Sequence, residues 1–201
     1  MSFSKYSSIP EFYNGKSVFI TGSTGFLGKV IVEKLLRSCE GIENVYLLVR
    51  PKKGKQASDR LGAFIKSPAF DLIKEKDPKI LDKIVLIEGD ITSIELGISK
   101  ADQEILCEKV SVIINSAATI NFDEILRVAV YTNLRSLREL IRLSRKMKHL
   151  EVKAIMKFCM EGQVCRLFFY SLSSTFRLPI PTGSNMMLRK NFIRLNAILM
   201  Q

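Results

Sequence analysis

Residues 16–30 read KSVFITGSTGFLGKV, which is a short apolar run, then three glycines three residues apart, then the start of an apolar helix. A loop that leads from a strand into a helix exposes unpaired backbone N–H groups, and the helix dipole adds about half a positive charge there. Such a place attracts phosphate. We expect Gly22 to allow the tight turn, Gly25 to let a pyrophosphate approach bare backbone, and Gly28 to let the helix pack against the strand. A Cβ is expected to intrude at each of the three positions.

The spacing of these glycines is T-G-x-x-G-x-x-G, one residue wider at the front than the G-x-G-x-x-G fingerprint. Three glycines alone are a weak signal, because glycine also serves as a plain turn residue. The context strengthens the signal, since the glycines follow a first strand and the second strand ends about twenty residues beyond Gly28. The sequence therefore predicts a dinucleotide-binding loop.

Apolar runs alternate with longer segments of helical period along the chain, as in sheets of parallel strands linked by crossover helices. The runs are continuously apolar, which is typical of strands buried on both faces. They occupy residues 17–21, 45–49, 84–88 and 110–114. This pattern predicts an α/β fold with a doubly wound parallel sheet, Rossmann-like, and we expect the sheet to be incomplete at its C-terminal side.

The segments between the strands are predicted to be helical. One face of the first helix is assigned to Leu27, Val30, Ile31, Lys34 and Leu35, with Lys34 as its polar exception.

Three later segments also have helical character. Residues 57–76 are helical in parts, with an end or kink at Pro68. Ser99 and Asp102 resemble a capping box that starts the next helix, and residues 123–148 form a long helical segment without proline or glycine.

Composition is that of a folded globular protein, with 201 residues, 47% hydrophobic and 25% charged. No window reaches the roughly 18 uninterrupted apolar residues of a membrane span, and residues 1–16 lack the apolar core of a signal peptide. We therefore expect an intracellular and, by sequence alone, cytoplasmic location. The cysteines match neither a zinc pattern nor a redox C-x-x-C, so we expect reduced thiols and no metal site. They are Cys39, Cys107, Cys159 and Cys165.

Lys and Arg outnumber Asp and Glu by 31 to 20, which gives a net charge of +11. This excess invites nucleic-acid or anionic-membrane partners, and it also suits a phosphate-bearing cofactor or substrate. We favour the phosphate-bearing ligand and expect no nucleic-acid partner. A row of arginines along residues 135–145 is interpreted as a solvated helix face.

The residues after the later strands refine the cofactor. The second strand runs into RPKKGK, which offers Arg50 and no acid, so NADP is preferred over NAD, and a solvated basic turn is the alternative. Asp90 after the third strand is interpreted either as an acceptor for the adenine amino group or as an ordinary turn residue. Ala117 and Ala118 after the fourth strand leave room for the ribose and nicotinamide.

Several segments together resemble the fatty acyl-CoA reductases of insects and animals, which are extended short-chain dehydrogenases. The matching segments stand in family order across roughly residues 9–152. They are IPEFYNGKSVFITGSTGFLGKVIVEKLLRSC, VYLLVRPKKGK, SPAFDLI, IEGDIT, ELGIS, NSAATINFDE and NLRSLRELIRLSRKMKHL. On this basis we divide the chain into an NADP-binding Rossmann domain, residues 1–152, and a divergent tail, residues 153–201.

The resemblance implies NADPH-dependent reduction of a long-chain fatty acyl-CoA to a fatty alcohol by two hydride transfers. It also implies location at the cytoplasmic face of a membrane or at the peroxisome, and membrane association in full-length members. The cofactor site that it implies consists of Gly22, Ser23, Thr24, Gly25, Phe26, Leu27, Gly28, Arg50, Asp90, Ile91, Ala117 and Ala118.

The sequence departs from the family in its catalytic residues. The family uses a Tyr-x-x-x-Lys pair, but none of the five tyrosines here has a lysine four residues later, so we assign no catalytic residue. Asn133 falls where the superfamily places a supporting asparagine, with a packing role as the alternative. Ser173 and Ser174 follow a strand expected within residues 164–175 and are weak candidates for a catalytic serine.

We therefore expect a truncated or inactive form of such a reductase. One alternative is a non-catalytic dinucleotide-binding protein, which the missing Tyr-x-x-x-Lys pair favours. Another is a different extended short-chain reductase acting on nucleotide sugars or sterols. These share the glycine loop but not the full set of matching segments.

Overall fold

A single sheet organises the chain in the computed structural model, which describes residues 8–50, 57–117, 133, 135–157 and 166–171. Over these residues the sheet has six strands in the order β3-β2-β1-β4-β5-β6. The strands are β1 Ser17–Thr21, β2 Val45–Val49, β3 Ile84–Glu88, β4 Val110–Asn115, β5 Val152–Lys157 and β6 Arg166–Ser171.

Strands β1 to β5 are parallel, and β6 pairs with β5 in the antiparallel direction. The chain moves outward from β1 to β2 and β3, then returns to place β4 on the other side of β1. The direction of winding therefore reverses between β1 and β4. In open α/β sheets, ligands bind at the carboxyl ends of the strands on either side of such a reversal.

The four predicted strands are confirmed, and their burial follows their place in the sheet. Every residue of β1, β2 and β4 is buried, whereas β3 is only partly buried because it is an edge strand. Alternate residues of β1 face opposite sides: Val18 and Ile20 belong to one apolar cluster and Phe19 to the other. The sheet therefore separates two hydrophobic cores, as a doubly wound fold requires.

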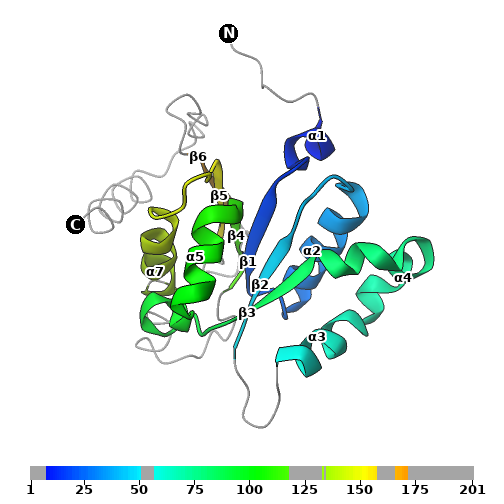
Figure 1. Ribbon diagram of the computed structural model, residues 1–201, viewed down its shortest axis with the longest axis horizontal. Helices are drawn as coiled ribbons and strands as arrows, with labels where there is room; N and C mark the ends of the chain where they lie inside the picture. The colour runs from blue at the N-terminus through cyan, green and yellow to red at the C-terminus, as the bar shows by residue number, and fades with distance from the viewer. Residues whose placement is uncertain (1–7, 51–56, 118–132, 134, 158–165, 172–201) are drawn as a thin grey trace.

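Helices cover both faces of the sheet. In Figure 1, α2, α3 and α4 lie on one side and α5 and α7 on the other, and the two apolar clusters show the same division. The α-helices are α1 Ile9–Tyr13, α2 Phe26–Ser38, α3 Ala57–Ile65, α4 Asp71–Lys76, α5 Lys100–Lys109 and α7 Ser136–Ser144. Three 3-10 segments connect them, η1 Pro68–Phe70, η2 Pro78–Lys83 and η3 Ile94–Gly97.

Local sequence signals explain where most helices begin. Pro68 starts η1 and separates α3 from α4, as predicted. The predicted N-cap is confirmed: Ser99 Oγ accepts the Asp102 N–H at 3.1 Å and donates to Asp102 Oδ2 at 2.7 Å, a side-chain contact in place of the reciprocal backbone bond of a capping box. The long helix predicted to reach residue 148 ends at Ser144, and residues 123–132 and 134 of that segment lie outside the described residues.

The predicted buried face of α2 is partly wrong. Lys34 and Val30 are exposed, and the buried face contains Val32, Leu35 and Leu36. Glu33 is also buried and pairs with Arg37 one turn later. The buried face of α2 is therefore rotated away from Val30 relative to the predicted face. The apolar pattern alone did not indicate this rotation.

The structure adds β5 at a place where no strand was predicted, directly at the start of the expected tail. It pairs in parallel with β4, with Val152 opposite Val112. The strand expected within residues 164–175 corresponds to β6, which is sixth in order and antiparallel. Residues 158–165 and 172–201, which include Cys159, Cys165, Ser173 and Ser174, lie outside the described residues, and the divergence of residues 153–201 stays a prediction.

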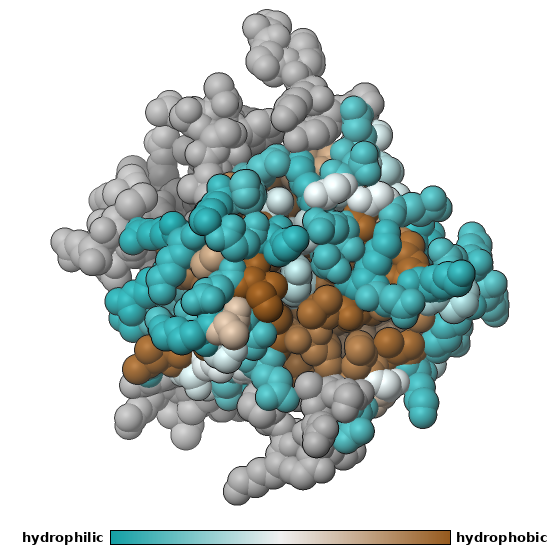
Figure 2. Space-filling model, in the orientation of Figure 1, coloured by the Kyte–Doolittle hydropathy of each residue, from teal (hydrophilic) through white to brown (hydrophobic). Residues whose placement is uncertain are grey.

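The surface of the described residues is mostly hydrophilic on the face shown in Figure 2, with an apolar area near its centre. Large hydrophobic residues that are well exposed include Phe26, at 87%, and Ile9, at 71%. None of the helices that the structure describes has the length and apolar character to cross a bilayer.

Replacing Gly28 by alanine is expected to destabilise the fold by about 1–3 kcal/mol, because the added Cβ overpacks a backbone contact. The Cβ would lie 2.3 Å from the Gly22 oxygen and 2.5 Å from the Ser23 Cα. Gly62 in α3 is the matched control, since its Cβ position has no described atom within 4 Å. Gly62→Ala is expected to stabilise by up to about 1 kcal/mol. Urea unfolding of both variants is the measurement, and equal effects of the two would contradict this packing argument.

Candidate functional site

The carboxyl ends of β1 and β4 are tied together at the reversal point of the sheet. Thr21 Oγ1 donates a hydrogen bond to Asn115 Oδ1, and the Ser116 hydroxyl donates to the Thr21 carbonyl at 2.7 Å. Gly22 adopts a positive φ of 70°, and a Cβ there would lie 2.6 Å from the Ala117 nitrogen. The two loops that follow these strands therefore touch, and only glycine fits the first position.

The glycine loop leads directly into α2 with its N-terminus uncapped by any side chain in the described part of the chain. Gly25 occupies the N-cap with extended backbone, and the first turn has no acidic residue. Thr24, Gly25 and Phe26 are exposed around it. The first-turn N–H groups and the positive end of the helix dipole are thus left for an anion.

The three glycines have different reasons to be glycine. Gly22 and Gly28 are required by the protein itself, because a Cβ at either would clash with backbone. At Gly25 the nearest atom among the described residues would be the Gly22 oxygen at 3.4 Å, an ordinary contact, and φ is −73°. The expected intrusion of a Cβ is met by protein backbone at Gly22 and Gly28, whereas at Gly25 the expectation concerned the pyrophosphate and stays a prediction. The absence of a side chain there leaves space that a ligand can use.

Ser23 is the second unusual feature of this loop. Its side chain is fully buried, and its hydroxyl has no hydrogen-bond partner among the described residues. A buried polar group without a partner costs about 1–3 kcal/mol, so native structures rarely keep one without a reason. The loop therefore combines free backbone donors with an unsatisfied hydroxyl.

The carboxyl ends of β2 and β3 bring Arg50 and Asp90 together. Arg50 Nε lies 3.0 Å from Asp90 Oδ2, and Arg50 Nη2 lies 3.2 Å from Asp90 Oδ1. Asp90 Oδ1 also accepts the Thr92 N–H at 2.9 Å and the Thr92 hydroxyl at 2.8 Å. Burial would raise the pKa of the Asp90 carboxyl, but these hydrogen bonds and the Arg50 charge outweigh it and hold the pKa below its usual value.

The structure gathers most predicted site residues at one edge of the sheet. Gly22 to Gly28 form the loop and first turn, Arg50 follows β2, Asp90 and the half-buried Ile91 follow β3, and Ala117 follows β4. Ala118 and the lysines of residues 51–56 lie outside the described residues. Asn133 is half-buried in a π-helical turn before α7, which leaves both of its predicted roles open.

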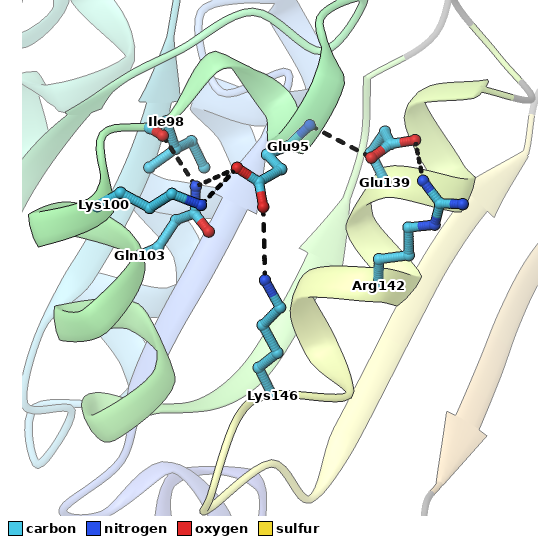
Figure 3. A network of polar contacts seen from close by, with 7 residues as sticks. All are labelled: Glu95, Ile98, Lys100, Gln103, Glu139, Arg142 and Lys146. Carbon is cyan, nitrogen blue, oxygen red and sulfur yellow. Dashed lines mark hydrogen bonds and ion pairs between the residues drawn. The ribbon is translucent and has the colours of Figure 1, made fainter.

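Sequence reasoning missed the residues that support the site. Ser116 and Thr92 lie beside predicted residues, and serine or threonine next to a strand end was the available signal. It also missed Glu139, which is 1% exposed and accepts hydrogen bonds from Arg138, Arg142 and the Glu95 N–H. Figure 3 shows Glu139 between Glu95 and Arg142. Arg138 and Arg142, which belong to the arginine row predicted to be a solvated face, therefore donate hydrogen bonds to this buried carboxylate.

A Rossmann-like strand order with a glycine loop at the reversal point defines a dinucleotide-binding type of domain. The family model described as male sterility protein matches residues 20–164. The chain belongs to the fatty acyl-CoA reductase family and corresponds to its N-terminal part. The match extends past residue 152, where the sequence indicated a change.

Individual relatives agree with this assignment. Fatty acyl-CoA reductase 1 of Mus musculus is 45% identical over 145 residues, which are 72% of this chain and 28% of that protein. Fatty acyl-CoA reductase wat of Drosophila melanogaster is 41% identical over the same shares of the two chains. The chain thus spans about a quarter of the length of these relatives.

Solved structures share the fold. The terminal R domain of the myxalamid PKS-NRPS pathway aligns with a TM-score of 0.57 and 25% identity, over 71% of this chain and 34% of that one. The reductase domain of a nonribosomal peptide synthetase from Mycobacterium tuberculosis aligns with a TM-score of 0.53 and 28% identity. The alignment covers 70% of this chain and 32% of that one. Both are reductase domains, and their likeness supports the predicted Rossmann-like fold.

Asp90→Asn is expected to lower stability at neutral pH, because the carboxylate loses its charge pair with Arg50. A group whose pKa is lowered by folding contributes stability above its unfolded pKa and loses it as the pH falls through its folded pKa. The difference from the wild type should therefore shrink as the pH drops below about 4. Urea unfolding across this range is the measurement, with Asp82→Asn at an exposed site as control. A difference independent of pH would contradict the assignment.

Proposed function

We propose that this chain binds NADPH and forms the cofactor-binding part of an enzyme that reduces long-chain fatty acyl-CoA to fatty alcohol. The proposal rests on the surroundings of Gly25. The described part of the protein has room for a side chain at this position, yet the residue is glycine. The pyrophosphate would lie there, against the N-terminus of α2. When bound, NADPH would supply the hydride for the reduction.

The residues present fit a dinucleotide at each end. The Ser23 hydroxyl of this loop has no partner among the described residues, and a loop movement that exposed it would let it donate to a phosphate oxygen. Ser116 and Ala117 are small residues beside Gly22, so the backbone after β4 is open to the ribose and nicotinamide. Phe26 exposes 87% of its surface at the start of α2, and covering it with a ligand would remove apolar area from water.

Arg50 supports the phosphorylated cofactor. Arginine has five N–H donors in a planar fork, and Asp90 engages Nε and Nη2. The Nη1 donors are left for a 2′-phosphate, since no contact of theirs occurs within the described residues. The side chain of Arg50 remains 60% exposed, so a ligand can reach it. The ion pair with Asp90 holds the guanidinium in place at the end of β2.

The substrate and product of the proposal come from the relatives, which are named fatty acyl-CoA reductases. Reduction of a thioester or aldehyde by hydride needs a proton donor for the developing oxyanion. The sequence contains no Tyr-x-x-x-Lys pair to serve as one. A missing general acid typically lowers the rate by about 10²–10⁴. We infer that this chain binds the cofactor and, by itself, turns over slowly or not at all.

A non-catalytic dinucleotide-binding protein is the second candidate function. The same missing Tyr-x-x-x-Lys pair favours it. Both candidates share the glycine loop and its cofactor, so binding of NADPH supports either one. They differ in whether hydride reaches a substrate.

Binding of NADPH is expected to weaken about tenfold or more in Gly25→Ala, because the new methyl group occupies the space proposed for the pyrophosphate. Folding stability should stay close to that of the wild type, since the Cβ meets no atom of the described residues closer than 3.4 Å. Fluorescence titration and thermal unfolding measure the two effects. Gly62 lies in α3, outside the glycine loop, so Gly62→Ala should bind NADPH as tightly as the wild type does. Unchanged binding in Gly25→Ala would overturn the proposed site.

Addition of palmitoyl-CoA to the NADPH-loaded chain is expected to consume no NADPH above the background rate. The physical reason is the missing proton donor. The absorbance of NADPH follows the reaction, and chromatography detects any fatty alcohol. Rapid consumption with alcohol formation would contradict the inference that this chain lacks a functional general acid.

A further inference from the structure

The segment after Asp90 contains a left-handed turn that includes two residues other than glycine. Glu95, Leu96 and Gly97 have φ values of 51°, 58° and 61°. For residues with a Cβ this conformation costs roughly 1–2 kcal/mol each. Such backbone persists only where the surrounding structure holds it.

This turn folds directly onto the predicted cofactor residue. The Asp90 N–H donates to the Leu96 carbonyl at 2.7 Å, and the Ser93 N–H donates to the Asp90 carbonyl at 2.9 Å. A Cβ at Gly89 would lie 2.5 Å from the Leu96 oxygen, so the backbones are in close contact. The position of the Asp90 backbone therefore depends on the left-handed turn.

Glu139 on α7 holds the same turn from the other side. Its Oε2 accepts the Glu95 N–H at 3.2 Å, and its Oε1 accepts from Arg138 at 3.2 Å and Arg142 at 3.1 Å. Burial would raise the pKa of the Glu139 carboxyl, but the Glu95 amide and the two arginines hold it below its usual value. A buried carboxylate of this kind is costly to disturb.

The side chain of Glu95 is tied down separately. Lys100 Nζ lies 2.8 Å from its Oε2 and Lys146 Nζ lies 3.5 Å from its Oε1, as Figure 3 shows. Both lysines are well exposed, so these ion pairs contribute little. Gln103 Nε2 also donates to the Ile98 carbonyl at 2.9 Å and reaches Glu95 Oε2 at 3.4 Å, and Leu96 is buried in the apolar core. Glu139 adds the contact that holds the Glu95 backbone N–H.

We propose that Glu139 is a positioning residue for cofactor selection. Through the Glu95 N–H it fixes the left-handed turn, the turn fixes the backbone of Asp90, and the Asp90 carboxylate orients Arg50 toward the 2′-phosphate. This inference rests on the proposed binding of NADPH. It adds a residue of α7, on the opposite face of the sheet from α2, to the determinants of the preference for NADPH over NADH.

The first test compares the affinities of the full chain for NADPH and NADH. Arg50→Gln sets the scale by removing the charge that contacts the 2′-phosphate. Glu139→Ala is expected to reduce the ratio of NADPH to NADH affinity by about tenfold. Glu139→Gln keeps an acceptor for the Glu95 N–H and should recover most of the ratio. Lys100→Ala, the control, removes only an exposed ion pair and should leave the ratio unchanged.

The second test needs no cofactor. Loss of Glu139 should speed hydrogen exchange of the Asp90 N–H and raise the pKa of the Asp90 carboxyl toward its usual value, both measured by NMR. If Glu139→Ala does not fold, Glu139→Asp withdraws the carboxylate from the Glu95 amide and is expected to act in the same direction.

The outcomes separate this inference from the function on which it rests. An unchanged affinity ratio together with unchanged Asp90 exchange in the Glu139 variants would overturn the inference alone. A wild-type chain that binds neither NADPH nor NADH would overturn the proposed function, and selection by Glu139 with it. Faster Asp90 exchange in that case would still support the contact between Glu139 and the turn.

Discussion

The site depends on one constraint, which is the close backbone contact between α2 and the glycine loop that precedes it. Gly28 lies against Gly22 and Ser23 so tightly that no Cβ fits between them. This contact fixes the direction of α2, and so aims its N-terminus along the carboxyl edge of the sheet. Gly22 in turn touches the backbone after β4. One contact thus sets both the packing of the helix and the position of the proposed anion site.

Charge is arranged around that place in pairs. The net charge is +11, yet Arg50 at the site and two arginines of α7 are matched with carboxylates. Arg50 meets Asp90, while Arg138 and Arg142 meet the buried Glu139. The Arg50–Asp90 pair is partly exposed and fixes geometry more than it adds stability, whereas the buried Glu139 carboxylate is costly to leave unpaired. The result is a set of oriented donors and acceptors at the edge of the sheet.

The sequence predicted the strands well because continuous apolar runs reflect burial on both faces, which is a local property. It did not indicate β5, whose Lys153 and Lys157 interrupt the apolar run. It also misplaced the buried face of α2, because a charged residue, Glu33, is buried there with Arg37 as its partner. In the candidate site, the glycine spacing was readable from the chain. The contacts of Arg50 with Asp90 and of Glu95 with Glu139 were not, because each joins residues about forty positions apart.

The direction of β6 has a consequence for the growth of the sheet. Its antiparallel ladder with β5 runs from Val152 opposite Ser171 to Lys157 opposite Arg166. The hydrogen-bonding groups on that side of β5 are therefore already committed. A further parallel strand could therefore pair directly with β5 on that side only by displacing β6.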